Sequence, residues 1–231
     1  MTNVSVFIST TKDGSMYDRH APTNPRIINN RKKFLKDQDI SFSHTTRVNP
    51  DMLERATVEF DKDYCRYIEV SDVDQGKGMN DGNVFVADAL ITTKTGHPLM
   101  LPVADCVGAV FYDSEHHILM VSHLGRHSLE QEGGKKCVEY LAEHHSSDPA
   151  QLKVWLTPAP SKELYPIWAL DNKGMKEVTF EQLLEAGMLK ENITDSPIDT
   201  DKDPNYFSYS EFLKGNRDED GDHMIVAVMN D

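Results

Sequence analysis

Cysteine, long apolar runs and positive charge are all scarce in this sequence of 231 residues. The three cysteines, Cys65, Cys106 and Cys137, cannot all pair with one another, so we expect reduced thiols in a cytoplasmic protein. The longest apolar runs, such as residues 99–103, fall far short of the roughly 18 residues that a membrane span requires. The opening MTNVSVFIST lacks a basic start before an apolar core, and we therefore expect no signal peptide.

Lysine and arginine number 24 against 38 aspartates and glutamates, which gives a formal net charge of −14. This surplus of negative charge repels phosphate backbones, and no local cluster of basic residues offers an exception. Nucleic acid and anionic membranes are therefore not expected as partners. The P-loop and the dinucleotide-binding fingerprint are missing, and so is any H-x-H pair, the ligation pattern of multicopper oxidases.

The pattern of apolar residues predicts strands and helices in mixed order. Strands are predicted at residues 4–8, 40–48, 66–70, 89–93, 98–113, 117–123, 153–159 and 223–229. Helices are predicted at residues 25–38, 129–145 and 180–188. Strands that follow one another directly, mixed with helices, indicate an α/β protein with mixed β-sheets rather than a doubly wound parallel sheet. Without an internal repeat or a linker-like segment, residues 1–231 are expected to form a single domain.

The candidate reactive residues lie between residue 104 and residue 123. A hairpin with its turn at Ser114-Glu115 would place Cys106 directly opposite His123, with Cβ atoms about 4.5–5.5 Å apart on one face. One zinc ion can bind a thiolate and an imidazole at that spacing. Taken alone, a cysteine facing a histidine is more often a coincidence of packing, because free cysteine is a common small core residue.

Three motifs of the chain occur in an order that resembles the bacterial laccase-domain family. They are ADALIT at residues 87–92, PLMLPVADC at residues 98–106 and HLG at residues 123–125. Upstream, Asn30-Arg31 and the pattern from His44 to Val48 are similar to the NR helix and H-G-x-x-V motif of this family, which is also called YfiH-like or purine nucleoside phosphorylase/multicopper-oxidase-like. The resemblance covers most of the chain and implies an α/β/β/α arrangement of mixed β-sheets flanked by helices.

The resemblance implies a zinc ion, Zn²⁺, held by His44, Cys106 and His123. Three protein ligands and an open fourth position are typical of a catalytic zinc site. Cys65 is a rival for the first ligand place, but His44 is preferred because the NR helix and the H-x-x-R-V pattern precede it in the expected order. Asp105, beside the thiolate, would orient a ligand or exchange a proton with the leaving base.

Asn30, Arg31 and Arg47 are expected to bind substrate. A guanidinium group binds phosphate in bidentate fashion, so the two arginines would hold an anionic co-substrate, and solvation at the surface is an equally good interpretation of them. Two motifs depart from the family pattern. Where the family continues HxG as W-R-G, this chain has Arg126-His127-Ser128, and its segment TPAPSKELYPIW lacks the cysteine of the family's C-Y-E-V.

The function that the resemblance implies is a cytoplasmic, zinc-dependent purine nucleoside phosphorylase acting on adenosine, inosine or guanosine and phosphate, with adenosine deamination as a further activity. One alternative is a hydrolase that edits a peptidoglycan precursor, with Cys106 as nucleophile and His123 as base. Another is a non-catalytic zinc-binding relative, which the loss of W-R-G permits. An oxidase is the weakest candidate, because one cysteine and two histidines cannot build a multicopper cluster.

Overall fold

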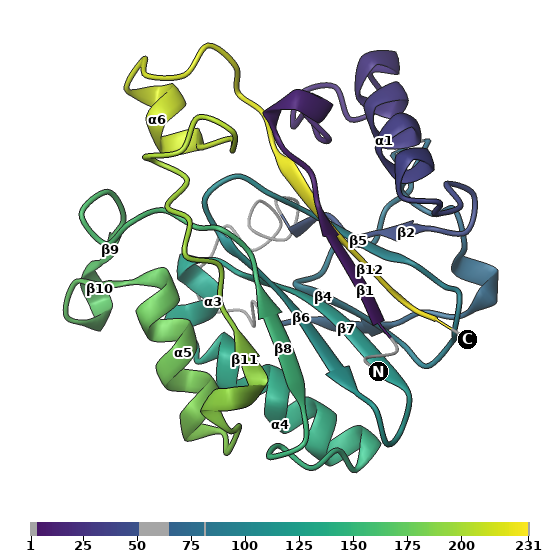
Figure 1. Ribbon diagram of the computed structural model, residues 1–231, viewed down its shortest axis with the longest axis vertical. Helices are drawn as coiled ribbons and strands as arrows, with labels where there is room; N and C mark the ends of the chain where they lie inside the picture. The colour runs from purple at the N-terminus through teal and green to yellow at the C-terminus, as the bar shows by residue number, and fades with distance from the viewer. Residues whose placement is uncertain (1–3, 51–64, 81, 231) are drawn as a thin grey trace.

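Two β-sheets lie face to face at the centre of the molecule, and helices lie on their outer faces (Figure 1). The computed structural model describes residues 4–50, 65–80 and 82–230. The four-stranded sheet has the order β1-β12-β5-β2 and consists of β1 (Val4–Ile8), β12 (His223–Met229), β5 (Leu99–Val103) and β2 (Thr46–Arg47). The six-stranded sheet has the order β11-β8-β6-β7-β4-β3 and consists of β11 (Ile193–Thr194), β8 (Lys153–Leu156), β6 (Val107–Asp113), β7 (Ile118–Leu124), β4 (Ala89–Thr92) and β3 (Tyr67–Glu69).

The helices divide between the two outer faces. Phe34 and Leu35 of α1 (Pro25–Asp37) pack on the four-stranded sheet. The six-stranded sheet is covered by α3 (Arg126–Glu130), α4 (Gly133–His145) and α5 (Met175–Glu185), as Figure 1 shows. Shorter elements are the hairpin of β9 (Pro166–Ile167) and β10 (Lys173–Gly174), the helix α6 (Tyr209–Leu213) and 3-10 helices at Thr11–Asp13, Asp72–Asp74, Trp168–Leu170 and Lys190–Asn192. The predicted α/β class with mixed sheets flanked by helices is confirmed.

Local sequence explains where α1 begins and why the strand predicted after it is short. The side chain of Asn24 accepts a hydrogen bond from the backbone N–H of Arg26, and Pro25 occupies the first helical position, as the sequence predicts. The strand predicted over residues 40–48 is wrong for most of its length. Thr45 donates to the carbonyl of Ser41 at 2.7 Å and closes a turn, so only Thr46–Arg47 pairs as a strand.

The hairpin of β6 and β7 forms, but with a register two residues away from the predicted one. His123 pairs with Gly108 rather than with Cys106. The turn occupies residues 114–117, because the carboxylate of Asp113 accepts hydrogen bonds from two backbone N–H groups of the turn. A shift of two residues keeps every side chain on its own face of the sheet, so Cys106 and His123 still share a face.

Within residues 4–50, 65–80 and 82–230, no helix is both long enough and apolar enough to cross a bilayer.

Candidate active site

Cys106 lies where the chain leaves one sheet and enters the other. β5 ends at Val103 in the four-stranded sheet, β6 begins at Val107 in the six-stranded sheet, and residues 104–106 connect them. His123 is the second-last residue of β7. Its neighbours Ser122 and Leu124 face the helices, so His123 projects toward the space between the sheets.

The absence of a side chain at Gly125 allows Cys106 and His123 to lie close to each other. A Cβ atom on Gly125 would stand 3.0 Å from Sγ of Cys106, 3.0 Å from Nε2 of His123 and 2.6 Å from Cε1 of the same ring. These distances leave no room for any side chain at residue 125. The predicted proximity of Cys106 and His123 is therefore found, and the predicted direct opposition of the two residues in the hairpin is wrong.

Asp88 orients the imidazole of His123 from the opposite side. Its Oδ1 lies 3.2 Å from Nδ1 of His123, and the Asp88 carbonyl accepts the backbone N–H of His123. Burial alone would lower the pKa of His123, but the hydrogen-bonded neighbours Cys106 and Asp88 raise that pKa well above its usual value. Burial raises the pKa of Asp88 itself. The structure thus contains a chain of carboxylate, imidazole and thiol.

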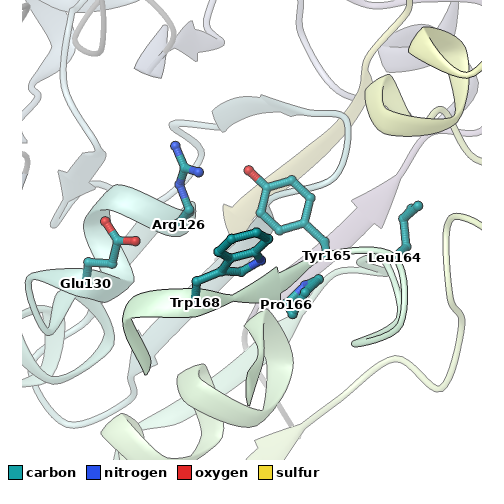
Figure 2. Close-up of a pocket in the computed structure, with 6 residues that line it drawn as sticks. All are labelled: Arg126, Glu130, Leu164, Tyr165, Pro166 and Trp168. Atoms are coloured by element: carbon teal, nitrogen blue, oxygen red, sulfur yellow. The ribbon is translucent and has the colours of Figure 1, made fainter. Parts of the chain in front are cut away.

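Two neighbouring cavities are lined by Cys106 and His123, and a third cavity adjoins one of them. The smallest, of about 80 Å³, is lined by Cys106, His123 and Arg126 among others. A cavity of about 200 Å³ shares Cys106 and His123 with it and is also lined by Arg19. A third, more open cavity of about 480 Å³ shares Arg126 and Tyr165 with the smallest one (Figure 2). Cys106 and His123 therefore line two adjoining cavities, and Arg126 and Tyr165 connect the smaller of these with the third.

Asp105 lines the cavity of about 200 Å³, but both of its carboxylate oxygens are already bound. Oδ1 accepts a hydrogen bond from Ser208 at 2.7 Å, and Oδ2 accepts bonds from the backbone N–H and the hydroxyl of Ser210 at 2.8 and 2.7 Å. These contacts fix the start of α6 and so place Tyr209 in the wall of the cavity. Despite these bonds, burial raises the pKa of Asp105.

The predicted substrate-binding residues Asn30, Arg31 and Arg47 line none of these cavities. Asn30 donates to the carbonyl of Ser15 at 2.8 Å, and the guanidinium of Arg31 donates to the carbonyls of Met16 and Met79. Both arginines are fully buried, so the interpretation as surface residues is wrong. Burial and the nearby Arg47 lower the pKa of Arg31 to about 9.

One carboxylate links this buried cationic cluster to the cavities. Asp222 lines the cavity of about 200 Å³ and acts electrostatically on Arg31. Arg47 lies over the ring of Tyr17, 5.5 Å from its centroid, and donates through Nε to the carbonyl of Gly78 at 2.7 Å. The two arginines therefore hold the segments around residues 16 and 78 and place positive charge behind the cavity wall.

His44 lies at the other end of β5 from Cys106. It precedes β2, whose Thr46 pairs with Leu99 at the start of β5. The strand rises about 13 Å from Leu99 to its last residue, and Cys106 comes still later in the chain. The structure therefore does not bring His44 to the pair, and His44 cannot bind the same ion in this arrangement.

Cys65, the rival ligand, lies closer to the pair but on the other face of the six-stranded sheet. It hydrogen-bonds Tyr67 and Ser128, and Tyr67 also contacts Cys137 on the helical side. Burial and the nearby Asp88 raise the pKa of Cys65 to about 11. Over residues 4–50, 65–80 and 82–230, no three histidine, cysteine or carboxylate side chains form a group that could hold a metal ion. The three-ligand zinc site is therefore not formed by these residues.

Comparison with known proteins first defines the class of the fold. The YfiH protein of Bacillus licheniformis superposes with a TM-score of 0.79 at 20% identity, over 98% of this chain and 93% of that one. YlmD from Geobacillus stearothermophilus superposes with a TM-score of 0.82 at 17% identity, over 99% and 93% of the two chains. The chain thus has the YfiH-like fold.

Sequence comparisons agree with this class. The model of a family described as multi-copper polyphenol oxidoreductase laccase matches residues 63–170, which include Asp88, Cys106 and His123. These matches confirm the resemblance to the bacterial laccase-domain, YfiH-like family. Purine nucleoside phosphorylase YlmD of Bacillus subtilis (strain 168) is 24% identical over an alignment of 170 positions that covers 62% of this chain. The match spans 60% of that relative's length. Both descriptions are those of enzymes, and that of the family names a metal.

Sequence reasoning did not assign a role to Asp88. The residue belongs to the ADALIT motif that carries the resemblance, and a carboxylate immediately before a fully buried strand is a usable signal. Its partner His123 is 35 residues away along the chain, and the two meet because β4 pairs with β7.

Proposed function

We propose that this chain is an enzyme of small-molecule metabolism that cleaves purine nucleosides with phosphate. In this reaction the ribosyl group of adenosine, inosine or guanosine is transferred to phosphate, and the free base is released. The observation that carries the proposal is the hydrogen-bonded chain of Asp88, His123 and Cys106, whose imidazole and thiol line two adjoining cavities. The name of the Bacillus subtilis relative supports the choice of substrate.

His123 acts as the general acid. A phosphate oxygen forms a bond to the anomeric carbon, the bond from that carbon to the base breaks, and the electron pair goes to the base nitrogen. That nitrogen takes the proton of His123, because Cys106 and Asp88 raise the pKa of the ring and so favour its protonated form. Asp88 holds the ring in one orientation and favours its protonated form, and Cys106 does the same from the other side.

Displacement at the anomeric carbon requires phosphate and base on opposite sides of the sugar. The three cavities suit this requirement, with phosphate in the cavity that Arg19 lines and the base in the cavity of about 480 Å³. Arg31 offsets the negative charge of Asp222 in the wall of this cavity, and as buried residues neither Arg31 nor Arg47 is assigned a direct contact with the anion. Asn30 and Asp105 are positioning residues, because their polar atoms hold neighbouring loops.

The expected zinc ion takes no part in this scheme. Zinc is the metal that a thiolate and an imidazole favour, and Cys106 with His123 supplies two of the expected three ligands. The described residues bring no third ligand to the pair, and the proposed steps use the side chains of this chain alone.

The test is release of hypoxanthine from inosine with and without phosphate. We expect release that depends on phosphate and is lost in His123→Ala, while His116→Ala at the hairpin turn serves as the matched control. Equal release without phosphate would show hydrolysis and overturn the proposal. Conversion of adenosine to inosine in the same assay would add the deaminase activity.

A second function is favoured by the order of the same three groups. Thiol, imidazole and carboxylate follow one another as nucleophile, base and orienting acid do in cysteine hydrolases. Hydrolysis of a muramyl-peptide precursor that requires Cys106, with no reaction of nucleosides, would favour this alternative. A folded protein that performs neither reaction would be the non-catalytic relative.

A further inference from the structure

The open cavity of about 480 Å³ has an unusual wall for a protein surface. It is lined by Arg126 and Glu130 of α3 and by residues 164–166 and Trp168, which follow β8 (Figure 2). Trp168 is 82% exposed. Large aromatic side chains dominate the cores and interfaces of proteins, so an indole that faces solvent beside a cavity offers a surface on which a flat ring can stack.

The backbone holds Trp168 in this exposed position. Ile167, the residue before it, is fully buried and pairs with Lys173 in the β9–β10 hairpin. The 3-10 helix Trp168–Leu170 then ends at Asp171, whose φ of 55° turns the chain back toward β10. The anchored Ile167 and the turn at Asp171 thus present Trp168 at the surface of this hairpin.

The polar groups of the wall carry both signs of charge. Arg126 presents a guanidinium, and Glu130 presents a carboxylate that lies 3.5 Å from Nδ1 of His127. Nη2 of Arg126 lies 3.1 Å from Nε2 of the same histidine, so the three side chains form one row. A paired cation and anion suit a neutral ligand that offers both acceptors and donors, and they suit an anion such as phosphate less well.

We propose that this cavity binds the heterocyclic base of the substrate, with Trp168 and Tyr165 against the faces of the ring and Arg126 and Glu130 at its polar edge. The guanidinium donates to ring nitrogens or a carbonyl oxygen, and the carboxylate accepts from a ring N–H or an amino group. Tyr165 and Arg126 also line the cavity of Cys106 and His123, so a base held here lies next to the acid. This assignment deepens the proposed function and rests on it for the identity of the ligand as a purine.

The test is a fluorescence titration of the full chain with hypoxanthine, a free base that needs no turnover. The chain has two tryptophans, and Trp155 in β8, which packs against the core between the sheets, is the matched control. Quenching should persist in Trp155→Phe and disappear in Trp168→Phe. In Trp168→Ala the base, followed by equilibrium dialysis, should bind about ten-fold more weakly, which corresponds to the loss of one stacking contact.

The two proposals fail separately. Quenching that depends on Trp168 in a protein that releases no base from nucleosides supports the base site and overturns the phosphorylase. Phosphorolysis with an unchanged KM for inosine in Trp168→Ala overturns the base site and leaves the phosphorylase standing. Equal quenching by inorganic phosphate or by a muramyl dipeptide also overturns the base site, because neither ligand has a flat ring.

Discussion

Replacing Asp88 with asparagine tests whether the carboxylate sets the protonation of His123. The substitution keeps the shape of the side chain and removes the charged acceptor 3.2 Å from Nδ1. A hydrogen bond to a charged group contributes about 1.5–3 kcal/mol, and one pKa unit corresponds to about 1.4 kcal/mol. The pKa of His123 should therefore fall by about one to two units in Asp88→Asn.

A lower pKa of His123 should shift the pH dependence of the reaction. Asp88 raises the pKa of His123, so removing the carboxylate lets the ring lose its proton at a lower pH than in the unmodified protein. Because only the protonated ring can act as the general acid, activity should then be lost at a lower pH as well. The alkaline limb of the pH profile of phosphorolysis should move toward acid by about one to two pH units, and on that limb kcat should fall by about 10- to 100-fold. An NMR titration of the His123 ring measures the same shift without any need for turnover.

A second pair of aspartate and histidine on the same hairpin supplies the control. Asp113 lies 2.9 Å from Nδ1 of His116 at the turn, at the far end of β6 from Cys106. Asp113→Asn should change thermal stability and leave the pH profile in place. An unchanged His123 titration in Asp88→Asn would refute the assigned role of Asp88.

Three further predictions concern packing, stability and metal. Gly125→Ala should abolish activity in a folded protein, because its Cβ would meet the ring of His123, while Gly82→Ala, with open space around it, should be silent in activity and circular dichroism. Burial lowers the pKa of His223 to about 3, whereas the same ring in the unfolded chain binds a proton below pH ~6.5. The free energy of unfolding should therefore decrease as the pH falls from ~6.5 toward ~3. His223→Phe should recover about 2 kcal/mol of that loss at pH ~5 in urea unfolding, and equal acid sensitivity of the two proteins would contradict this. Zinc analysis should give the same metal content for the purified protein and for His44→Ala, and loss of zinc in His44→Ala would contradict the placement of that residue.

The elements of the fold follow from local sequence wherever a local signal is strong. The helix α1 begins at Asn24-Pro25 because capping and the fixed φ of proline act within one turn of chain. The strand predicted over residues 40–48 failed because β-branched and aromatic composition does not exclude a turn. The hydrogen bond from the hydroxyl of Thr45 to the carbonyl of Ser41 forms a turn where a strand was predicted.

The site was harder to predict because its geometry depends on strand register and sheet order. The sequence indicates Cys106 and His123 as partners, but the turn capped by Asp113 moves the register by two residues. Only the even size of this shift keeps the two side chains on one face. The role of Asp88 requires knowledge that β4 lies beside β7, which no local pattern contains.

The burial of two arginines could not be predicted from their positions in the sequence. Arg31 lies on a helix of low average hydrophobicity, where a solvated position is the usual outcome for a basic residue. Its burial follows from backbone carbonyls at residues 16 and 79, which belong to loops far away in sequence. A clamp for phosphate and an internal brace for loops need the same residue type, and tertiary contacts distinguish them.

The connection at residues 104–106 ties the thiol mechanically to both sheets. Cys106 follows a strand of one sheet directly and precedes a strand of the other, whereas His123 belongs to the six-stranded sheet alone. A small sliding of one sheet over the other would therefore displace the sulfur relative to the ring before it altered either sheet internally. Trimming the layer between the sheets, for example by Val110→Ala, would then change the reactivity of Cys106 from a distance. In this architecture the alignment of Cys106 with His123 depends on how closely the two sheets pack against each other.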